Sequence, residues 1–139
     1  MSATYATTAA PRTTTSIRSL AGSGAVATAA ASVATPIVAA VGQAVGISLD
    51  IAGAPIPVLG FGTLTAFFSL VGVVLAVVVS RVARHPRSTF IRTTMVLTGL
   101  SFVPDLIVDA APATRALLIV THVVAAAIVV PALARRLGA

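Results

Sequence analysis

Two uncharged stretches, Leu20 to Leu49 and Ile51 to Ser80, decide what this chain can fold into, because a single charge, Asp50, separates them. An apolar α-helix needs about 20 residues to cross a bilayer, and each stretch is longer than that. Of the 139 residues, 58% are hydrophobic and 9% are charged, whereas about 25% of residues are charged in soluble domains. The sequence therefore predicts an all-α membrane protein.

Four spans are expected, packed as one four-transmembrane-helix bundle that forms a single domain over residues 20–136. The break before the second span comes from Pro55 and Pro57, and Pro112 suits the first turn of the fourth. Between the first two spans, Ile47, Leu49 and Ile51 alternate with other residues, so residues 46–59 should form an ordered loop on the helix ends. The expected spans are residues 24–45, 60–80, 93–110 and 113–134.

The N-terminal residues 1–19 are rich in Thr and lack an apolar face, so we expect a disordered cytoplasmic tail. A cleaved signal peptide is the alternative, because Arg12 and Arg18 precede the apolar run and "SVAT" at 32–35 resembles a cleavage site. The run is longer than the apolar core of an ordinary signal peptide, which reaches about 15 residues. We therefore expect the first helix to be retained.

The nine arginines mark the borders of the apolar runs and do not form a basic face interleaved with aromatic residues, so nucleic acid is not an expected partner. Eight of them fall on one side of the membrane in the four-span arrangement, and Arg115 falls on the other with the three aspartates. Loops rich in arginine stay on the cytoplasmic side. The sequence predicts a multi-pass protein of the cell membrane with both termini in the cytoplasm and the lipid bilayer around it.

A polar hairpin joins the third and fourth spans. Asp105 lies 13 residues after Arg92, and His122 lies 13 residues before Arg135, so both should sit about 20 Å across the membrane. Ionisable groups at this depth turn away from lipid. We expect Asp105 to contact His122, and Asp109 to reach Arg115 nearer the surface. The predicted intramembrane polar cluster is Ser101, Asp105, Asp109, Arg115 and His122.

Enzymatic chemistry is not expected from this cluster. The sequence "GLSFV" around Ser101 lacks the second glycine of a nucleophile elbow, and nothing marks an oxyanion hole. The chain has no cysteine, which excludes thiolate metal sites and thiol redox chemistry. His85 lies on the opposite side of the membrane from His122, so neither a metal site nor a cofactor is expected.

Small residues at helical spacing predict close helix packing. They are Gly42, Gly46, Ser69, Gly72 and Ala76. Packing within one chain is the expected use, while a homo-oligomer or a complex with other membrane proteins is the alternative, because G-x-x-x-G is a weak signal in a chain rich in Ala and Gly.

The C-terminal part of the chain, from residue 100 onward, resembles an uncharacterised family of small actinobacterial four-helix membrane proteins, a domain of unknown function. The resemblance rests on Ser101 and Pro104 in a Ser-x-x-Pro motif and on "THVVAAAIVVPALARRL" with His122 and Pro131. Thr121 departs from the pattern, since the family often has Met before the histidine. The resemblance implies the four-span arrangement and retention of the first helix, and implies nothing about mechanism.

Two functions remain open at this stage. The first is a non-enzymatic structural or accessory membrane component, in which Asp105 and His122 clamp two helices. The second is a small transporter or proton-coupled subunit that uses the same pair. Four-span exporters normally carry an acid in the first helix, and this first helix has none.

Overall fold

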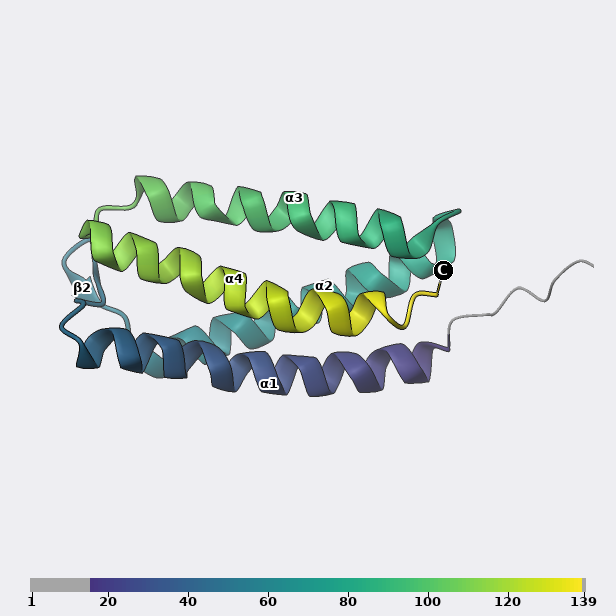
Figure 1. The fold of residues 1–139 in the computed structure, drawn as a ribbon, viewed down its shortest axis with the longest axis horizontal. Coiled ribbons are helices and arrows are strands. Elements are labelled where there is room, and N and C mark those ends of the chain that lie inside the picture. Colours follow the sequence, from purple (N-terminus) through teal and green to yellow (C-terminus); the bar gives the residue numbers. More distant parts are fainter. Residues whose placement is uncertain (1–15, 139) are drawn as a thin grey trace, which may run out of the picture.

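The computed structural model describes residues 16–138, and four long helices form an antiparallel bundle (Figure 1). Helix α1 packs against α2 and α4, and α3 packs against α4 and α2. Figure 1 shows α4 lying between α1 and α3, with a small hairpin at one end of the bundle. The elements are α1 (Ile17–Ala44), β1 (Asp50–Ile51), β2 (Ala54–Pro55), α2 (Val58–Val82), α3 (Pro86–Ile107) and α4 (Pro112–Ala134).

All four helices are long and apolar enough to cross a membrane, with lengths of 28, 25, 22 and 23 residues. Even the shortest is about 33 Å long at about 1.5 Å per residue, against an apolar bilayer core of about 30 Å. The predicted all-α bundle with four spans is therefore confirmed, and the start of α4 at Pro112 is the predicted one.

Helices α1 and α3 differ most from the expected spans. Of the residues assigned to the tail, Ser16 is the N-cap of α1 and residues 17–19 belong to its first turn, while residues 1–15 lie outside the described residues. Helix α3 begins at Pro86 and ends at Ile107, where residues 93–110 were expected. Its start was missed because hydropathy marks the apolar run, whereas a proline-initiated helix extends beyond it, through Arg87 and Arg92.

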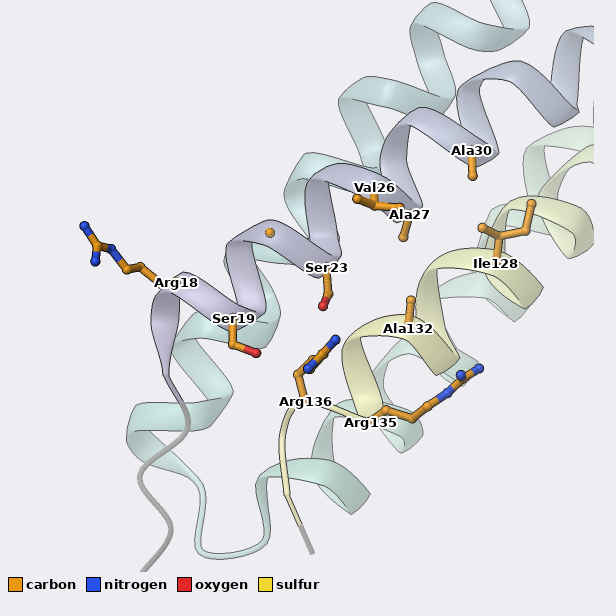
Figure 2. Close-up of a pocket in the computed structure, with 11 residues that line it drawn as sticks. Arg18, Ser19, Ser23, Val26, Ala27, Ala30, Ile128, Ala132, Arg135 and Arg136 are labelled. Carbon is orange, nitrogen blue, oxygen red and sulfur yellow. The ribbon is translucent and has the colours of Figure 1, made fainter.

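The two ends of the bundle differ in charge. The arginine end, where α1 and α3 begin and α2 and α4 end, carries Arg18, Arg81, Arg84, Arg87, Arg92, Arg135 and Arg136, three of which are drawn in Figure 2. The loop end, where the hairpin lies, carries Asp50, Asp109 and a single arginine, Arg115. This separation is the one that the arginine pattern predicts.

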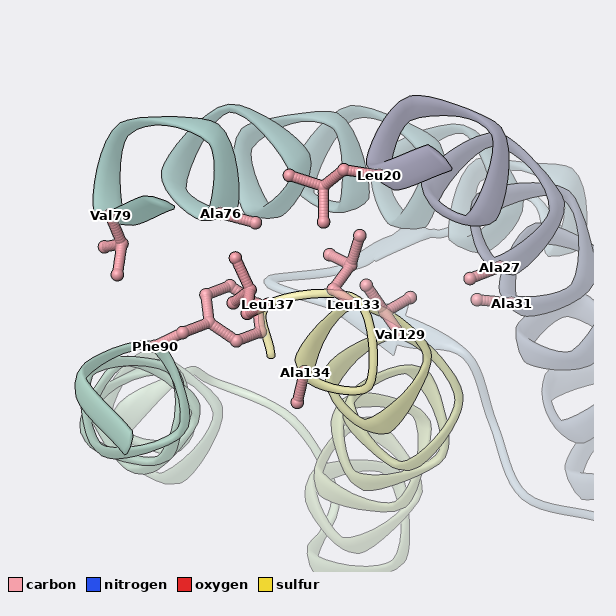
Figure 3. Packing of buried hydrophobic residues seen from close by; sticks show 10 residues of the cluster. All are labelled: Leu20, Ala27, Ala31, Ala76, Val79, Phe90, Val129, Leu133, Ala134 and Leu137. Atoms are coloured by element: carbon pink, nitrogen blue, oxygen red, sulfur yellow. The ribbon is translucent and has the colours of Figure 1, made fainter. Parts of the chain in front are cut away.

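Buried apolar residues form two clusters, one toward each end. The cluster at the arginine end centres on Phe90 and Leu133, both fully buried, and draws on all four helices (Figure 3). Leu137, just past the end of α4, folds back into it. The cluster at the loop end consists of Ala39, Leu49, Phe61, Leu117 and Leu118.

Helices α1 and α2 approach each other closely at Gly62. A Cβ atom added to Gly62 would lie 2.7 Å from the backbone oxygen of Ser32 and 3.1 Å from Cγ of Pro36. Because Pro36 has no N–H, the Ser32 carbonyl has no partner at that position within α1. Near this point the hydroxyls of Thr35 and Thr65 lie 2.9 Å apart and link the two helices.

The predicted packing residues divide in two. Ala76 is fully buried, Ser69 is 6% exposed, and a Cβ on Gly42 would lie 2.7 Å from Cδ2 of Leu117. Gly72 contributes less, because a Cβ there would meet only Val129, at 4.0 Å.

Gly46 was wrongly assigned to packing. It has φ +89°, and a Cβ there would meet nothing within 4 Å. Its N–H bonds the Gln43 carbonyl at 3.0 Å, and the Ile47 N–H bonds the Gly42 carbonyl at 2.9 Å. This is the Schellman pattern, in which a left-handed glycine ends a helix.

The predicted ordered loop is present at the loop end. Strands β1 and β2 pair antiparallel, and the turn uses Ala52 and Gly53 with φ 52° and 79°, as tight hairpin turns require. The Ala52 N–H donates to the Asp109 carbonyl at 2.8 Å, and the Thr114 hydroxyl donates to the Ser48 carbonyl at 2.6 Å. These bonds attach the loop to the connection between α3 and α4 and to the first turn of α4.

Candidate functional site: the Asp105–His122 contact

Asp105 on α3 and His122 on α4 meet across the helix interface. Their nearest atoms, Oδ2 of Asp105 and Nδ1 of His122, lie 3.0 Å apart. The prediction that these groups share one level of the bundle is therefore confirmed. Equal residue counts from Arg92 and Arg135 place them at one height, because every residue of an α-helix adds the same rise along the axis.

The imidazole also faces the backbone of its own helix. Nδ1 lies 3.0 Å from the carbonyl oxygen of Leu118, one turn earlier. A carbonyl can only accept, so Nδ1 must carry a hydrogen for this bond. With that hydrogen directed at Leu118, Oδ2 of Asp105 is buried without a well-directed hydrogen bond. The contact with Asp105 is thus chiefly electrostatic.

The two side chains differ in exposure. The Asp105 side chain is 11% exposed, and the His122 side chain is 39% exposed. Phe102, one turn before Asp105, lies edge to face with the imidazole at a centroid distance of 6.4 Å. A desolvated charge without a partner is costly. Loss of the contact should therefore cost more when the buried Asp105 is left alone than when the more exposed His122 is left alone.

The remaining members of the predicted cluster are not brought to this pair. The Ser101 hydroxyl donates to the Thr98 carbonyl of its own helix at 2.7 Å. Asp109 and Arg115 form no ion pair in the part of the chain that the structure describes, so that predicted contact is wrong. The reason is that α3 ends at Ile107 and Val108 is extended, which takes Asp109 off the helical face assumed for it.

Two partners of the pair were missed by sequence reasoning, namely Phe102 and the Leu118 carbonyl. Both follow from helix geometry, because Phe102 lies three residues before Asp105 and Leu118 four residues before His122. Residues three and four apart share a helix face. Arg115 Nε is buried without a hydrogen-bond partner among residues 16–138. No pattern in the sequence predicted this burial.

Two surface hollows among the described residues lie away from the pair. Two hollows of about 830 and 300 Å³ are both at the arginine end, and neither is lined by Asp105 or His122. Within residues 16–138 no group of three or more His, Cys, Asp or Glu residues is placed to hold a metal ion. The arrangement can hold two helices together through an electrostatic contact.

The four spans and the buried ionic contact between two of them define a small multi-pass membrane protein. Residues 15–139 match a family of unknown function, DUF6069, and the chain belongs to that family. No curated protein and no solved structure matches the chain.

Proposed function

We propose that this protein is a non-enzymatic structural or accessory component of the cell membrane, in which Asp105 and His122 act as a clamp between α3 and α4. The observation that carries the proposal is the sparse burial of α3. That helix buries only Phe90, Thr94 and Asp105 among the described residues.

These three residues are unevenly placed along α3. Phe90 inserts into the apolar cluster at the arginine end, and Thr94 lies one turn further and bonds its own helix. Asp105 is the single buried anchor of the half of α3 toward the loop end. Apolar side chains there, such as Leu100 and Leu106, are exposed, and lipid solvates them as well as protein would. Attachment of that half therefore depends on the polar contact.

A transporter or proton-coupled subunit is the alternative function. It draws support from the 39% exposure of the His122 side chain, because an ionisable group within a membrane span often marks a path for protons or ions. Against it, neither of the two hollows described above is lined by Asp105 or His122. A non-enzymatic role also agrees with Ser101, whose hydroxyl bonds Thr98 and not His122.

Proton flux distinguishes the two functions. In sealed vesicles with a pH gradient and a potassium-valinomycin potential, we expect purified protein to give no flux above that of protein-free vesicles. The Asp105→Asn variant should behave identically. A flux in the wild type that Asp105→Asn abolishes would contradict the clamp and establish the alternative.

The arginine end is proposed to face the cytoplasm, with both termini on that side. The chain has no cysteine, so single cysteines report topology directly. We expect Ala54→Cys, in β2, to react with a membrane-impermeant maleimide in intact cells, and Ser88→Cys, in the first turn of α3, to react only after lysis. Both positions are exposed. The reverse pattern would invert the proposed topology.

A further inference from the structure

The larger hollow is an open groove of about 830 Å³ between the start of α1 and the end of α4. Its floor is apolar and made of small side chains, including Ala27, Ala30 and Ala132. Its mouth carries Arg18, Arg135 and Arg136. An apolar groove in a membrane span that opens beneath several arginines matches a molecule with an anionic head and an apolar chain.

Figure 2 shows how the polar groups lie. The side chain of Arg136 reaches into the space between α1 and α4, and the hydroxyls of Ser19 and Ser23 point toward it. Arg18 and Arg135 extend away on either side of the groove. One guanidinium is therefore already placed over the groove, and two more flank it on flexible side chains.

Charge at this site is not balanced by nearby acids. All three acidic residues of the chain are Asp50, Asp105 and Asp109, and none lies at the arginine end. The first turn of α1 also favours an anion, because the free N–H groups at a helix start carry partial positive charge. This turn has no acidic residue and no side-chain cap that would offset that charge.

We propose that this groove binds one anionic glycerophospholipid from the leaflet at the arginine end. The phosphate diester accepts hydrogen bonds from the Arg136 guanidinium and from Ser19 and Ser23, since arginine suits phosphate oxygens in a bidentate geometry. One acyl chain lies along Val26, Ala30 and Ile128, which line the groove further into the membrane.

The dimensions agree with such a ligand. Arg18 and Ala30 are separated by about 18 Å along α1 at about 1.5 Å per residue, which is more than half of an apolar core of about 30 Å. An acyl chain spans one leaflet, about half of that core. The head would thus lie beside the arginines while its chain follows the groove.

Native mass spectrometry of the full chain in mild detergent tests the proposal, with phosphatidylglycerol and phosphatidylcholine as probes. We expect the wild type to retain one phosphatidylglycerol in preference to phosphatidylcholine. Arg136→Gln should reduce that retention about fivefold, the change expected from one basic residue at a lipid surface. Arg84→Gln, which removes the same charge at the other hollow, is the matched control and should change retention less than twofold.

A second pair of variants tests the acyl-chain contact without changing charge. Ala30→Phe fills the groove and should reduce phosphatidylglycerol retention, whereas Ala29→Phe, on an exposed position of α1 that does not line it, should not. Equal effects of Arg136→Gln and Arg84→Gln, or equal retention of the two lipids, would overturn the proposal. Displacement of the lipid by millimolar inorganic phosphate would also overturn it, since a bound acyl chain resists such exchange.

Discussion

Replacing Gly62 with alanine is expected to lower the free energy of unfolding by up to about 2 kcal/mol, the balance of a steric clash and a gain in helix propensity. The added Cβ would lie 2.7 Å from the Ser32 backbone oxygen, and a backbone atom cannot rotate away as a side chain can. Overpacking of this kind costs about 1 to 3 kcal/mol, offset in part by about 1 kcal/mol that alanine gains over glycine in a helix. Helices α1 and α2 must separate to admit the methyl group.

Gly72→Ala is the matched control on the same helix. Its Cβ would meet only Val129 at 4.0 Å, so the gain in helix propensity remains without a clash, and this variant should be unchanged or slightly stabilised. Both free energies can be measured by denaturation in bicelles followed by helical circular dichroism. Equal stabilities of the two variants would mean that α1 and α2 do not approach at Gly62 as the structure has them.

The four-span bundle could be predicted because the length of each apolar run and the arginines at its ends are visible in the sequence. The ends of α3 could not be predicted, since hydropathy does not change at Pro86 or at Ile107. The role of Gly46 was missed for a related reason. A glycine four residues after another resembles a packing motif, and only its φ of +89° shows that it ends a helix.

Residue spacing predicted the part of the site that lies within regular helices. Asp105 and His122 lie within regular helices, so counting residues placed them at one level, and their contact at 3.0 Å followed. Asp109 and Arg115 lie next to the α3–α4 connection, where Val108 is extended. Residue spacing cannot place a side chain beyond the point at which the helix ends, and that contact failed.

His122→Ala should destabilise the protein more than Asp105→Asn does, although the two variants break the same contact. Removing His122 leaves Asp105, with its side chain 11% exposed, as a buried carboxylate without compensation. Such a change costs about 3 to 5 kcal/mol in soluble proteins. Because the His122 side chain is 39% exposed and solvent or lipid headgroups can screen the site, we expect about 2 kcal/mol, less than in that reference.

Asp105→Asn removes the charge and keeps the shape, and His122 keeps its hydrogen bond to the Leu118 carbonyl. Its cost should therefore stay below about 1 kcal/mol, the size of one net hydrogen bond. In the Asp105→Asn background, His122→Ala should cost less than it does alone, because no carboxylate is then left buried. Unfolding free energies in bicelles complete this double-mutant cycle.

Amide hydrogen exchange over residues 98–107 locates the effect of the substitution. If the clamp holds the loop-end half of α3, exchange there should rise in His122→Ala while residues 86–94 stay protected. Uniform exchange along α3, or a larger cost for Asp105→Asn than for His122→Ala, would contradict it.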